Sequence, residues 1–193
     1  MATPPQEGKL LYHLTSFKNI ESIFRNGLIA RNDLNSFDDV AEQKIIDHRE
    51  AMDLNGLVPF HFFGGTPFDG AVQNTHTGKA FVFITIKRTF AYRNGFRILT
   101  QHPLSLTNCT TLPYEEGFNS INWDVMNLRD YSSHVCREIC MAECLSPITI
   151  NPADFFCIYT PNIEVNKKVE KLRDSILGES AFFVNVNAAL FVK

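Results

Sequence analysis

Alternating side chains mark out strands along most of the chain. Residues 80–87 give the clearest one, because apolar or β-branched side chains occupy both of its faces, as in a strand buried on one or both sides. Shorter runs of the same kind lie before and after it. The predicted strands cover residues 10–15, 58–63, 80–87, 95–100, 155–159, 181–186 and 190–192.

Helices are predicted where apolar residues recur three and four positions apart. Residues 164–177 give the clearest helix, and Gly178 ends it. Strands mixed with helices early and late in the chain predict an α+β fold. The other predicted elements are a helix capped by Ser16 and ended by Gly27, helices at 38–52 and 122–131, a short helix opened by Thr66 and Pro67, a loop at 104–117, and a near-apolar run at 138–145.

Length and composition fit one globular domain. The chain has 193 residues, is 45% hydrophobic and 20% charged, and has no linker-like stretch that would divide residues 1–193. No run of about 18 apolar residues predicts a membrane-spanning helix. The first residues lack the apolar segment of a secretion signal. Five cysteines, an odd number, favour reduced thiols and a cytoplasmic protein.

The net charge of −3 hides an asymmetry along the chain. Residues 70–114 contain no Asp or Glu and hold five of the 18 basic residues, so the remainder holds 13 basic and 21 acidic residues, a net charge of −8. A basic block on an acidic body is a candidate surface for an anion or a polynucleotide. The alternative is a solvated face that pairs with acids from elsewhere in the fold.

Several well-known catalytic motifs do not occur. Without a Walker A loop, GxGxxG, HExxH or GxSxG, the sequence argues against a P-loop NTPase, a Rossmann dehydrogenase, a zincin and an α/β-hydrolase. Cys136, Cys140 and Cys144 recur every four residues, but this spacing does not match the paired CxxC knuckles of structural zinc sites. On a strand, residues four apart lie about 13 Å apart, so we expect packed thiols and no metal.

Glu143 is the most informative candidate for chemistry. It lies in the apolar run Ile139–Leu145, where a carboxylate is costly to bury unless a function requires it. Burial would also hold its pKa away from the solvent value, as catalytic carboxylates often need. The alternative is an edge strand on which Glu143 faces solvent.

Two other residues could bind a ligand. His13 and Thr15 point to the same side of the first strand at its end, where they could contact hydroxyl or amide groups, unless His13 is a core histidine bonded to backbone. Arg49 lies in a helix rich in acids. It could clamp a phosphate bidentately, or it could form an ion pair with a neighbour such as Glu42.

Four segments of the chain form an ordered pattern. They are Tyr12-His13-Leu14-Thr15 with Asn19, Ile20, Ile23, Gly27 and Leu28, then Val58–Phe63, then Thr66-Pro67-Phe68, and finally Arg137 through Ala142-Glu143-Cys144-Leu145. In this order they resemble the DarT toxins, bacterial DNA ADP-ribosyltransferases of the wider ADP-ribosyltransferase superfamily. The second and third segments resemble the family's VPFYF…SPM sequence, and the fourth resembles its AEFL segment, which carries the catalytic glutamate. The closing strands ending at Phe191 also fit.

The chain also departs from the family pattern. His61 stands where the family usually has Tyr, Phe68-Asp69-Gly70 replaces an aliphatic continuation, and Arg137 is followed by the acidic Glu138. These differences indicate a divergent branch. They leave open the target base, because relatives modify thymidine or guanine, and they leave open DNA against RNA.

The resemblance implies a fold and a role for individual residues. The fold would be a split mixed or antiparallel sheet with flanking helices around an NAD cleft. His13 would bond the nicotinamide-side ribose of NAD with Thr15 beside it, and Arg49 would hold the pyrophosphate. Phe62 and Phe63 would line or support the nicotinamide pocket. Glu143 would be the catalytic carboxylate, with Arg49 and His13 completing the catalytic set.

The resemblance also implies partners. The substrate would be single-stranded DNA or RNA, because a base must leave its stack to reach the pocket, and an antitoxin protein would hold the enzyme inactive. Alternatives are a protein substrate or a catalytically inactive single-strand-binding module. The strand-binding surface would lie in the acid-free block, where cations for the backbone alternate with aromatic rings for stacking: Lys87, Arg88, Arg93, Arg97 and Tyr92.

Overall fold

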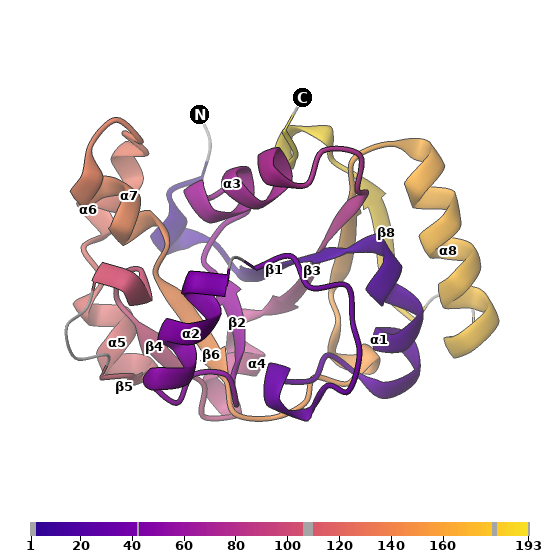
Figure 1. Ribbon diagram of the computed structural model, residues 1–193, viewed down its shortest axis with the longest axis horizontal. Helices are drawn as coiled ribbons and strands as arrows, with labels where there is room; N and C mark the ends of the chain where they lie inside the picture. Colours follow the sequence, from indigo (N-terminus) through magenta and orange to yellow (C-terminus); the bar gives the residue numbers. More distant parts are fainter. Residues whose placement is uncertain (1–2, 42, 106–109, 179–180, 193) are drawn as a thin grey trace.

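An eight-stranded mixed sheet runs through the molecule, with helices on both of its faces (Figure 1). The computed structural model describes residues 3–41, 43–105, 110–178 and 181–192. The strand order is β5-β4-β6-β2-β1-β3-β7-β8, and every pair is antiparallel except β7 with β8. The α+β prediction is therefore confirmed. The strands are β1 Leu10–Ser16, β2 Val58–His61, β3 Phe81–Lys87, β4 Arg97–Leu99, β5 Leu112–Pro113, β6 Glu143–Ser146, β7 Cys157–Thr160 and β8 Phe183–Val186.

The sheet is split between β1 and β2. Every residue of β1 has a partner on β3, whereas β1 and β2 pair at the single position Tyr12–His61. The half formed by β5, β4, β6 and β2 is thus joined only weakly to the half formed by β1, β3, β7 and β8. The predicted split sheet is present, and it opens beside the end of β1.

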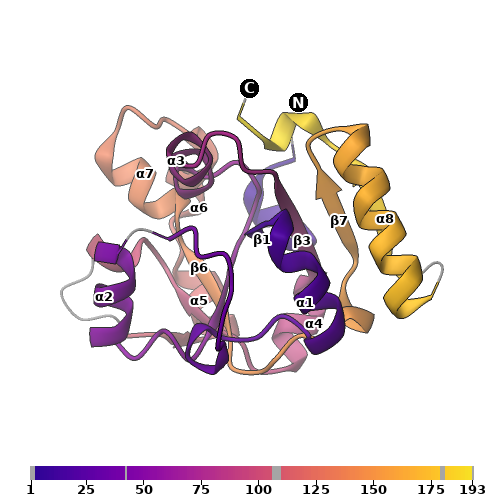
Figure 2. The ribbon, with the colours of Figure 1, turned by 45° about the vertical axis from the view of Figure 1, so that its right-hand side comes forward.

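The helices divide between the two halves of the sheet. The helices α1 and α8 lie side by side over one face of the β1–β8 half, and α3 covers the opposite face (Figures 1 and 2). A group of short helices surrounds the other half, and α2 lies in front of it. The helices are α1 Ile20–Asn26, α2 Gln43–Ala51, α3 Pro67–Thr75, α4 Arg88–Arg93, α5 Tyr114–Ser120, α6 Trp123–Leu128, α7 His134–Cys140 and α8 Ile163–Leu177.

The alternating side chains of β1 pack into two hydrophobic clusters. Leu11 is fully buried in the larger cluster with Ile84 and Ile158 from neighbouring strands, while Leu14 packs in a second cluster with Phe83. Because successive strand residues point to opposite faces, both faces of this half of the sheet are covered. That explains why residues 80–87 read as an almost continuous apolar run.

Two local signals work as the sequence predicts. Gly27 ends α1 with φ of +87°, and a Cβ there would lie 2.7 Å from the methyl group of Thr149, so only glycine fits. Thr66 and Asp69 form a capping box at the start of α3: the Thr66 hydroxyl accepts from the Asp69 N–H, and the Asp69 carboxylate accepts from the Thr66 N–H.

Three predictions about elements are wrong or incomplete, and one helix has no prediction. The helix predicted at 38–52 begins at Gln43 in the described residues, because Asp38 and Asp39 take part in tertiary contacts instead. The predicted loop at 104–117 lies partly outside the described residues (106–109), and its remainder contains β5 and the start of α5. The strand predicted at 190–192 is wrong, because Ala188–Leu190 forms a 3-10 turn. Arg88–Arg93, which was given no element, is helix α4.

Within the part of the chain that the structure describes, no helix combines the length and the apolar character needed to cross a membrane.

Candidate active site

An open cleft lies where the sheet splits, between α1, α2 and the segment 28–41 that connects them. The lining of the cleft mixes polar and apolar side chains. The polar lining residues include His13, Thr15, Arg49, His61, His102 and Glu143, with Arg31, Asp38 and Asp39 from the segment 28–41, and the apolar ones include Ile23, Leu28, Leu34, Phe37, Val40 and Ile45.

Glu143 and Arg49 form a buried ion pair in this cleft. Arg49 Nη1 lies 2.9 Å from Oε1 and 2.6 Å from Oε2 of Glu143, and Arg49 Nη2 donates to the Leu54 carbonyl at 3.3 Å. Their side chains are only 9% and 8% exposed. The arginine partner satisfies the carboxylate, which explains how this acid is tolerated in an apolar run.

Strand pairing and helix packing bring these two side chains together. Glu143 is the first residue of β6 and is paired with His61 on β2 and with Leu99 on β4. Helix α2 lies over the same face, where Leu54 packs against Leu99 and Leu145. Arg49 is the buried residue of α2. The predicted alternative of Glu143 facing solvent at an edge is therefore wrong, since β6 lies between β4 and β2.

His13 and Thr15 lie together at the end of β1, as the strand alternation predicts. The Nδ1 atom of His13 donates to the carbonyl of Pro59 at 2.8 Å, so the His13 ring bridges the split between the two halves of the sheet. Burial lowers the pKa of His13 to about 4. The ring is therefore neutral near pH 7, and its other nitrogen, Nε2, is a hydrogen-bond acceptor.

The cleft contains two histidines that sequence reasoning did not assign to the site. His61 donates through Nδ1 to the Ala142 carbonyl at 3.1 Å and is 6% exposed. In the sequence, position 61 stands out only because the DarT family usually has tyrosine there. His102 is half-buried, and burial lowers its pKa to about 4. No local pattern distinguishes His102 from a loop histidine, because only the fold carries it toward Glu143.

Comparison with known proteins identifies the family. The family model described as "DarT: ssDNA thymidine ADP-ribosyltransferase, DarT" matches residues 12–191. The chain belongs to the DarT family. The comparison with curated proteins gave no match.

Solved DarT structures share the fold at low sequence identity. Thermus sp. 2.9 DarT in complex with ADP-ribosylated ssDNA matches with a TM-score of 0.85 and 18% identity, covering 96% of this chain and 97% of that one. The same protein in complex with NAD+ matches with a TM-score of 0.79 and 17% identity over 96% of this chain and 98% of that one. Thermosipho africanus DarTG in complex with ADP-ribose matches with a TM-score of 0.72 and 19% identity, over 95% of this chain and 51% of that longer chain.

Membership in the DarT family makes this protein an NAD-dependent ADP-ribosyltransferase whose substrate is single-stranded DNA. The cleft suits the dinucleotide because its lining combines polar side chains, including the carboxylate of Glu143, with apolar surface. The buried Oδ1 atom of Asn55, which lines the cleft, has no partner within the described residues and offers a further acceptor. The residues present therefore fit NAD.

Phe62 and Phe63 do not line the cleft, so of the two roles that the DarT resemblance implies for them, lining the pocket is wrong. Both rings are buried, Phe62 against Trp123 and Phe63 under the Arg129 guanidinium at 4.6 Å. The cleft is instead lined by Pro59 and His61. The physical reason is the alternation along the β2 segment, which sends Phe62 to the face opposite His61.

Arg88 is a structural residue, so its assignment to the DNA-binding surface of this DarT protein is wrong. It is 7% exposed and stacks over the ring of Phe62 at 5.1 Å. Its guanidinium donates to four main-chain carbonyls, those of Pro5, Gln6, Leu10 and Phe62. Four of the five guanidinium N–H donors are therefore used by the main chain, and the group is buried away from any approaching phosphate.

The other residues of the predicted surface differ in how accessible they are. Tyr92 and Arg93 are exposed on α4, where the Tyr92 ring lies 5.7 Å from that of Tyr114. Lys87 is exposed and lies over the Phe156 ring. Arg97 is half-buried and donates to the Thr111 hydroxyl and carbonyl. None of these side chains lines the NAD cleft itself.

The cysteines pack as free thiols, although Cys136, Cys140 and Cys144 do not share one strand. Cys136 and Cys140 lie on α7, with sulfur atoms 3.9 Å apart, whereas Cys144 belongs to β6. All three are buried, and Cys157 is also a buried free thiol. In the described ranges no group of three or more His, Cys, Asp or Glu side chains could hold a metal ion.

Proposed function

We propose that this DarT-family enzyme transfers ADP-ribose from NAD to a thymine base of single-stranded DNA, with Glu143 as the catalytic carboxylate. The observation that carries the proposal is the Glu143–Arg49 pair, a buried carboxylate in the wall of the cleft. Thymine as the target rests on the family description. Guanine and RNA remain outcomes of the experiment below.

NAD, when bound, supplies the ADP-ribosyl group and nicotinamide as the leaving group. The ribose carbon gains positive charge as the bond to nicotinamide weakens. A fixed carboxylate in a site with little water stabilises that charge, because its dipolar surroundings are already oriented. Glu143 can then accept the proton that the attacking nucleobase nitrogen loses.

Arg49 acts through Glu143 in this proposal. Both of its Nη atoms are already engaged, Nη1 by the carboxylate and Nη2 by the Leu54 carbonyl. We therefore assign Arg49 to orienting Glu143 and not to holding the pyrophosphate. Two hydrogen bonds from one guanidinium nitrogen also fix the direction in which the carboxylate points.

His13 and Thr15 hold the ribose next to nicotinamide. With Nδ1 donating to the Pro59 carbonyl, neutral His13 presents Nε2 as an acceptor for a ribose hydroxyl. The Thr15 hydroxyl, which already accepts from Asn19 at 3.2 Å, can donate to the same sugar. These contacts fix the sugar beside Glu143, and positioning of this kind lowers the barrier.

The DNA approaches from the surface of α4. Exposed Arg93 and Lys87 supply cations for phosphates, and exposed Tyr92 supplies a ring for base stacking. Thermus DarT in complex with ADP-ribosylated ssDNA supports a polynucleotide partner for this fold. An antitoxin partner is supported by Thermosipho DarTG, and the acidic remainder of the chain is a candidate face for it. A single domain over residues 1–193 that acts in the cytoplasm is part of the same proposal.

The test mixes the protein with NAD labelled in the adenylate and with single-stranded oligonucleotides. One oligonucleotide contains thymine as its sole reactive base, a second lacks thymine but keeps guanine, and a third is the RNA equivalent. We expect labelling of the first alone and its loss in Glu143→Gln, which keeps the size of the side chain. Labelling of the guanine or RNA oligonucleotide would overturn the thymine assignment, and full activity in Glu143→Gln would overturn the catalytic one.

A further inference from the structure

The middle of NAD is a diphosphate, and the cleft must supply cations for it. Among the described residues that line the cleft, the lysine or arginine side chains are Arg31 and Arg49. Arg49 is buried and donates hydrogen bonds to the Glu143 carboxylate and the Leu54 carbonyl. If its side chain moved to a phosphate, the catalytic carboxylate would lose its partner. The diphosphate therefore needs a different cation.

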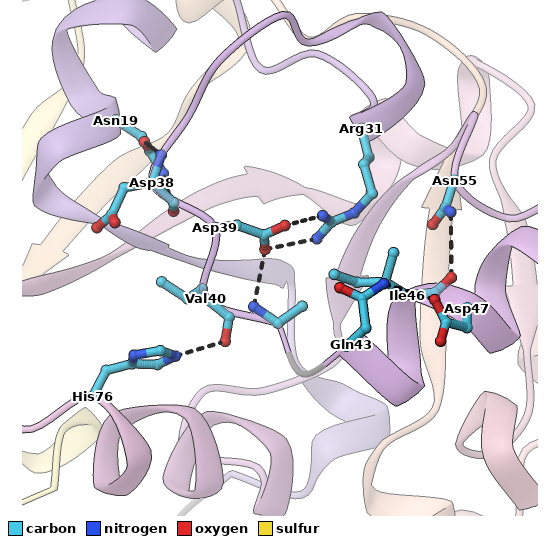
Figure 3. Close-up of polar contacts among 11 residues, drawn as sticks. Asn19, Arg31, Asp38, Asp39, Val40, Gln43, Ile46, Asp47, Asn55 and His76 are labelled. Atoms are coloured by element: carbon cyan, nitrogen blue, oxygen red, sulfur yellow. Dashed lines mark hydrogen bonds and ion pairs between the residues drawn. The ribbon is translucent and has the colours of Figure 1, made fainter.

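Arg31 has the geometry of a phosphate ligand. Its Nη1 and Nη2 atoms donate to the two carboxylate oxygens of Asp39, a fork-to-fork arrangement (Figure 3). A phosphate accepts the same pair of parallel hydrogen bonds from a guanidinium. The Phe37 ring lies 5.1 Å from the guanidinium carbon, so contact with this face leaves the donor edge available.

Asp39 can release Arg31 without becoming a buried charge that has no partner. The side chain of Asp39 is 35% exposed and that of Arg31 is 25% exposed, so water reaches both groups. The Ala41 N–H also donates to Asp39 Oδ1 at 3.0 Å, and this bond does not involve Arg31. An exchange of the carboxylate for a phosphate therefore costs much less here than it would at the buried Glu143–Arg49 pair.

The segment around Asp39 is held by neighbours on either side of it. Asn19 exchanges two hydrogen bonds with the Asp38 backbone, at 2.8 and 3.1 Å, and Lys79 pairs with the Asp38 carboxylate at 2.7 Å. His76 bonds the Val40 carbonyl at 3.2 Å (Figure 3). The backbone thus stays in place when the side-chain pair opens, and only the partner of Arg31 changes.

We propose that Arg31 binds the diphosphate of NAD and that Asp39 occupies Arg31 in its place while the cleft is empty. This inference rests on the proposed function and names the residue that recognises one part of its substrate. On binding, the hydrogen bonds from Arg31 to the Asp39 carboxylate break, and hydrogen bonds from Arg31 to the diphosphate form in their place. Because the two anions compete for one cation, loss of the Arg31 charge weakens binding, whereas loss of the Asp39 charge does not.

The experiment measures ADP-ribose binding by calorimetry and the KM and kcat for NAD, using the full chain. Arg31→Gln is expected to raise the Kd for ADP-ribose and the KM at least about tenfold, with kcat changed less than about twofold. Asp39→Asn, which removes the competing charge, is expected to keep or lower the Kd. Arg25→Gln is the matched control, because Arg25 forms an ion pair with Glu21 on α1 that is 57% exposed, and it should change neither constant.

Two results would overturn the inference alone. One is an unchanged ADP-ribose affinity in Arg31→Gln. The other is an affinity loss in Asp39→Asn as large as that in Arg31→Gln, since a purely structural ion pair loses the same contact from either side. If the wild-type chain binds no ADP-ribose and modifies no DNA, the proposed function fails together with the inference.

Discussion

Removing one member of the Glu143–Arg49 pair tests whether the site is built as the structure indicates. Arg49→Met replaces the guanidinium by an apolar chain of similar length and leaves Glu143 charged in the cleft wall. Both side chains are less than a tenth exposed, and Arg49 donates twice to the carboxylate and once to Leu54. Little water can therefore replace the lost partner.

The expected cost follows from this burial. Breaking a buried ion pair by removing one partner costs about 3–5 kcal/mol, because the remaining charge is uncompensated. For a chain of this size each kcal/mol lowers Tm by about 2–4 °C, so the fall in Tm is about 6–20 °C. Replacing both partners by apolar residues removes the stranded charge, and Arg49→Met combined with Glu143→Leu should recover much of the stability.

Urea unfolding of the wild type, the two single variants and the double variant closes a thermodynamic cycle. We expect a coupling energy of at least about 1 kcal/mol, with the double variant more stable than the sum of the singles predicts. Arg25→Met at the exposed Arg25–Glu21 pair is the control and should cost less than about 1 kcal/mol. Additive single effects would refute the reasoning, because they would mean that the two side chains do not interact in solution.

Three further predictions test other parts of the molecule. Arg88→Met should lower the free energy of unfolding by about 3 kcal/mol or more, since four carbonyls lose a donor, while DNA affinity of the folded protein stays as in the wild type; a loss of affinity without a loss of stability would contradict the structural role. Arg93→Glu should weaken binding of single-stranded DNA, measured by fluorescence anisotropy at two salt concentrations, more than it weakens NAD binding; equal losses would place Arg93 elsewhere in the mechanism. His13 has its pKa lowered to about 4 by burial. The unfolded chain therefore binds a proton near pH 6.5 that the folded chain excludes, and stability is full above that pH and falls as the pH drops toward 4. The part due to His13 is about 2 kcal/mol between pH 7 and pH 5, so urea unfolding of His13→Gln should depend less on pH by that amount, and an unchanged dependence would refute the assignment.

Local patterns are sufficient where neighbours in the sequence are also neighbours in the fold. The periodicity of residues 80–87 and 164–177 predicts β3 and α8, since burial on two faces or on one stripe leaves its mark directly on the sequence. Glu143 could be found in the same way, because a single carboxylate in an apolar run is unusual. Gly27 ends α1 for a reason that is equally local.

Long-range pairing could not be predicted in this way. Arg49 and Glu143 are 94 positions apart, and nothing near Arg49 distinguishes it from the other charged residues of its helix. The charge of residues 70–114 shows that cations are present but not which of them are exposed. Arg93 is exposed, whereas Arg88 is buried, and the sequence pattern does not distinguish the two. A lining role for Phe62 is wrong because the resemblance identifies the segment and not the face toward which each side chain points.

The split in the sheet explains how polar chemistry coexists with a closed core. Each half of the sheet is stabilised by its own strand pairing, since all of β1 pairs with β3 and β2 pairs with β6 through four positions. The single β1–β2 pair, Tyr12–His61, therefore contributes little to the stability of the sheet. The His13 side chain spans the opening by donating to the Pro59 carbonyl. Each half then contributes one part of the site, His13 and Thr15 from one and Glu143 from the other. Because these parts are fixed to separately stabilised halves, changes that shift one half against the other should impair catalysis before they unfold the protein.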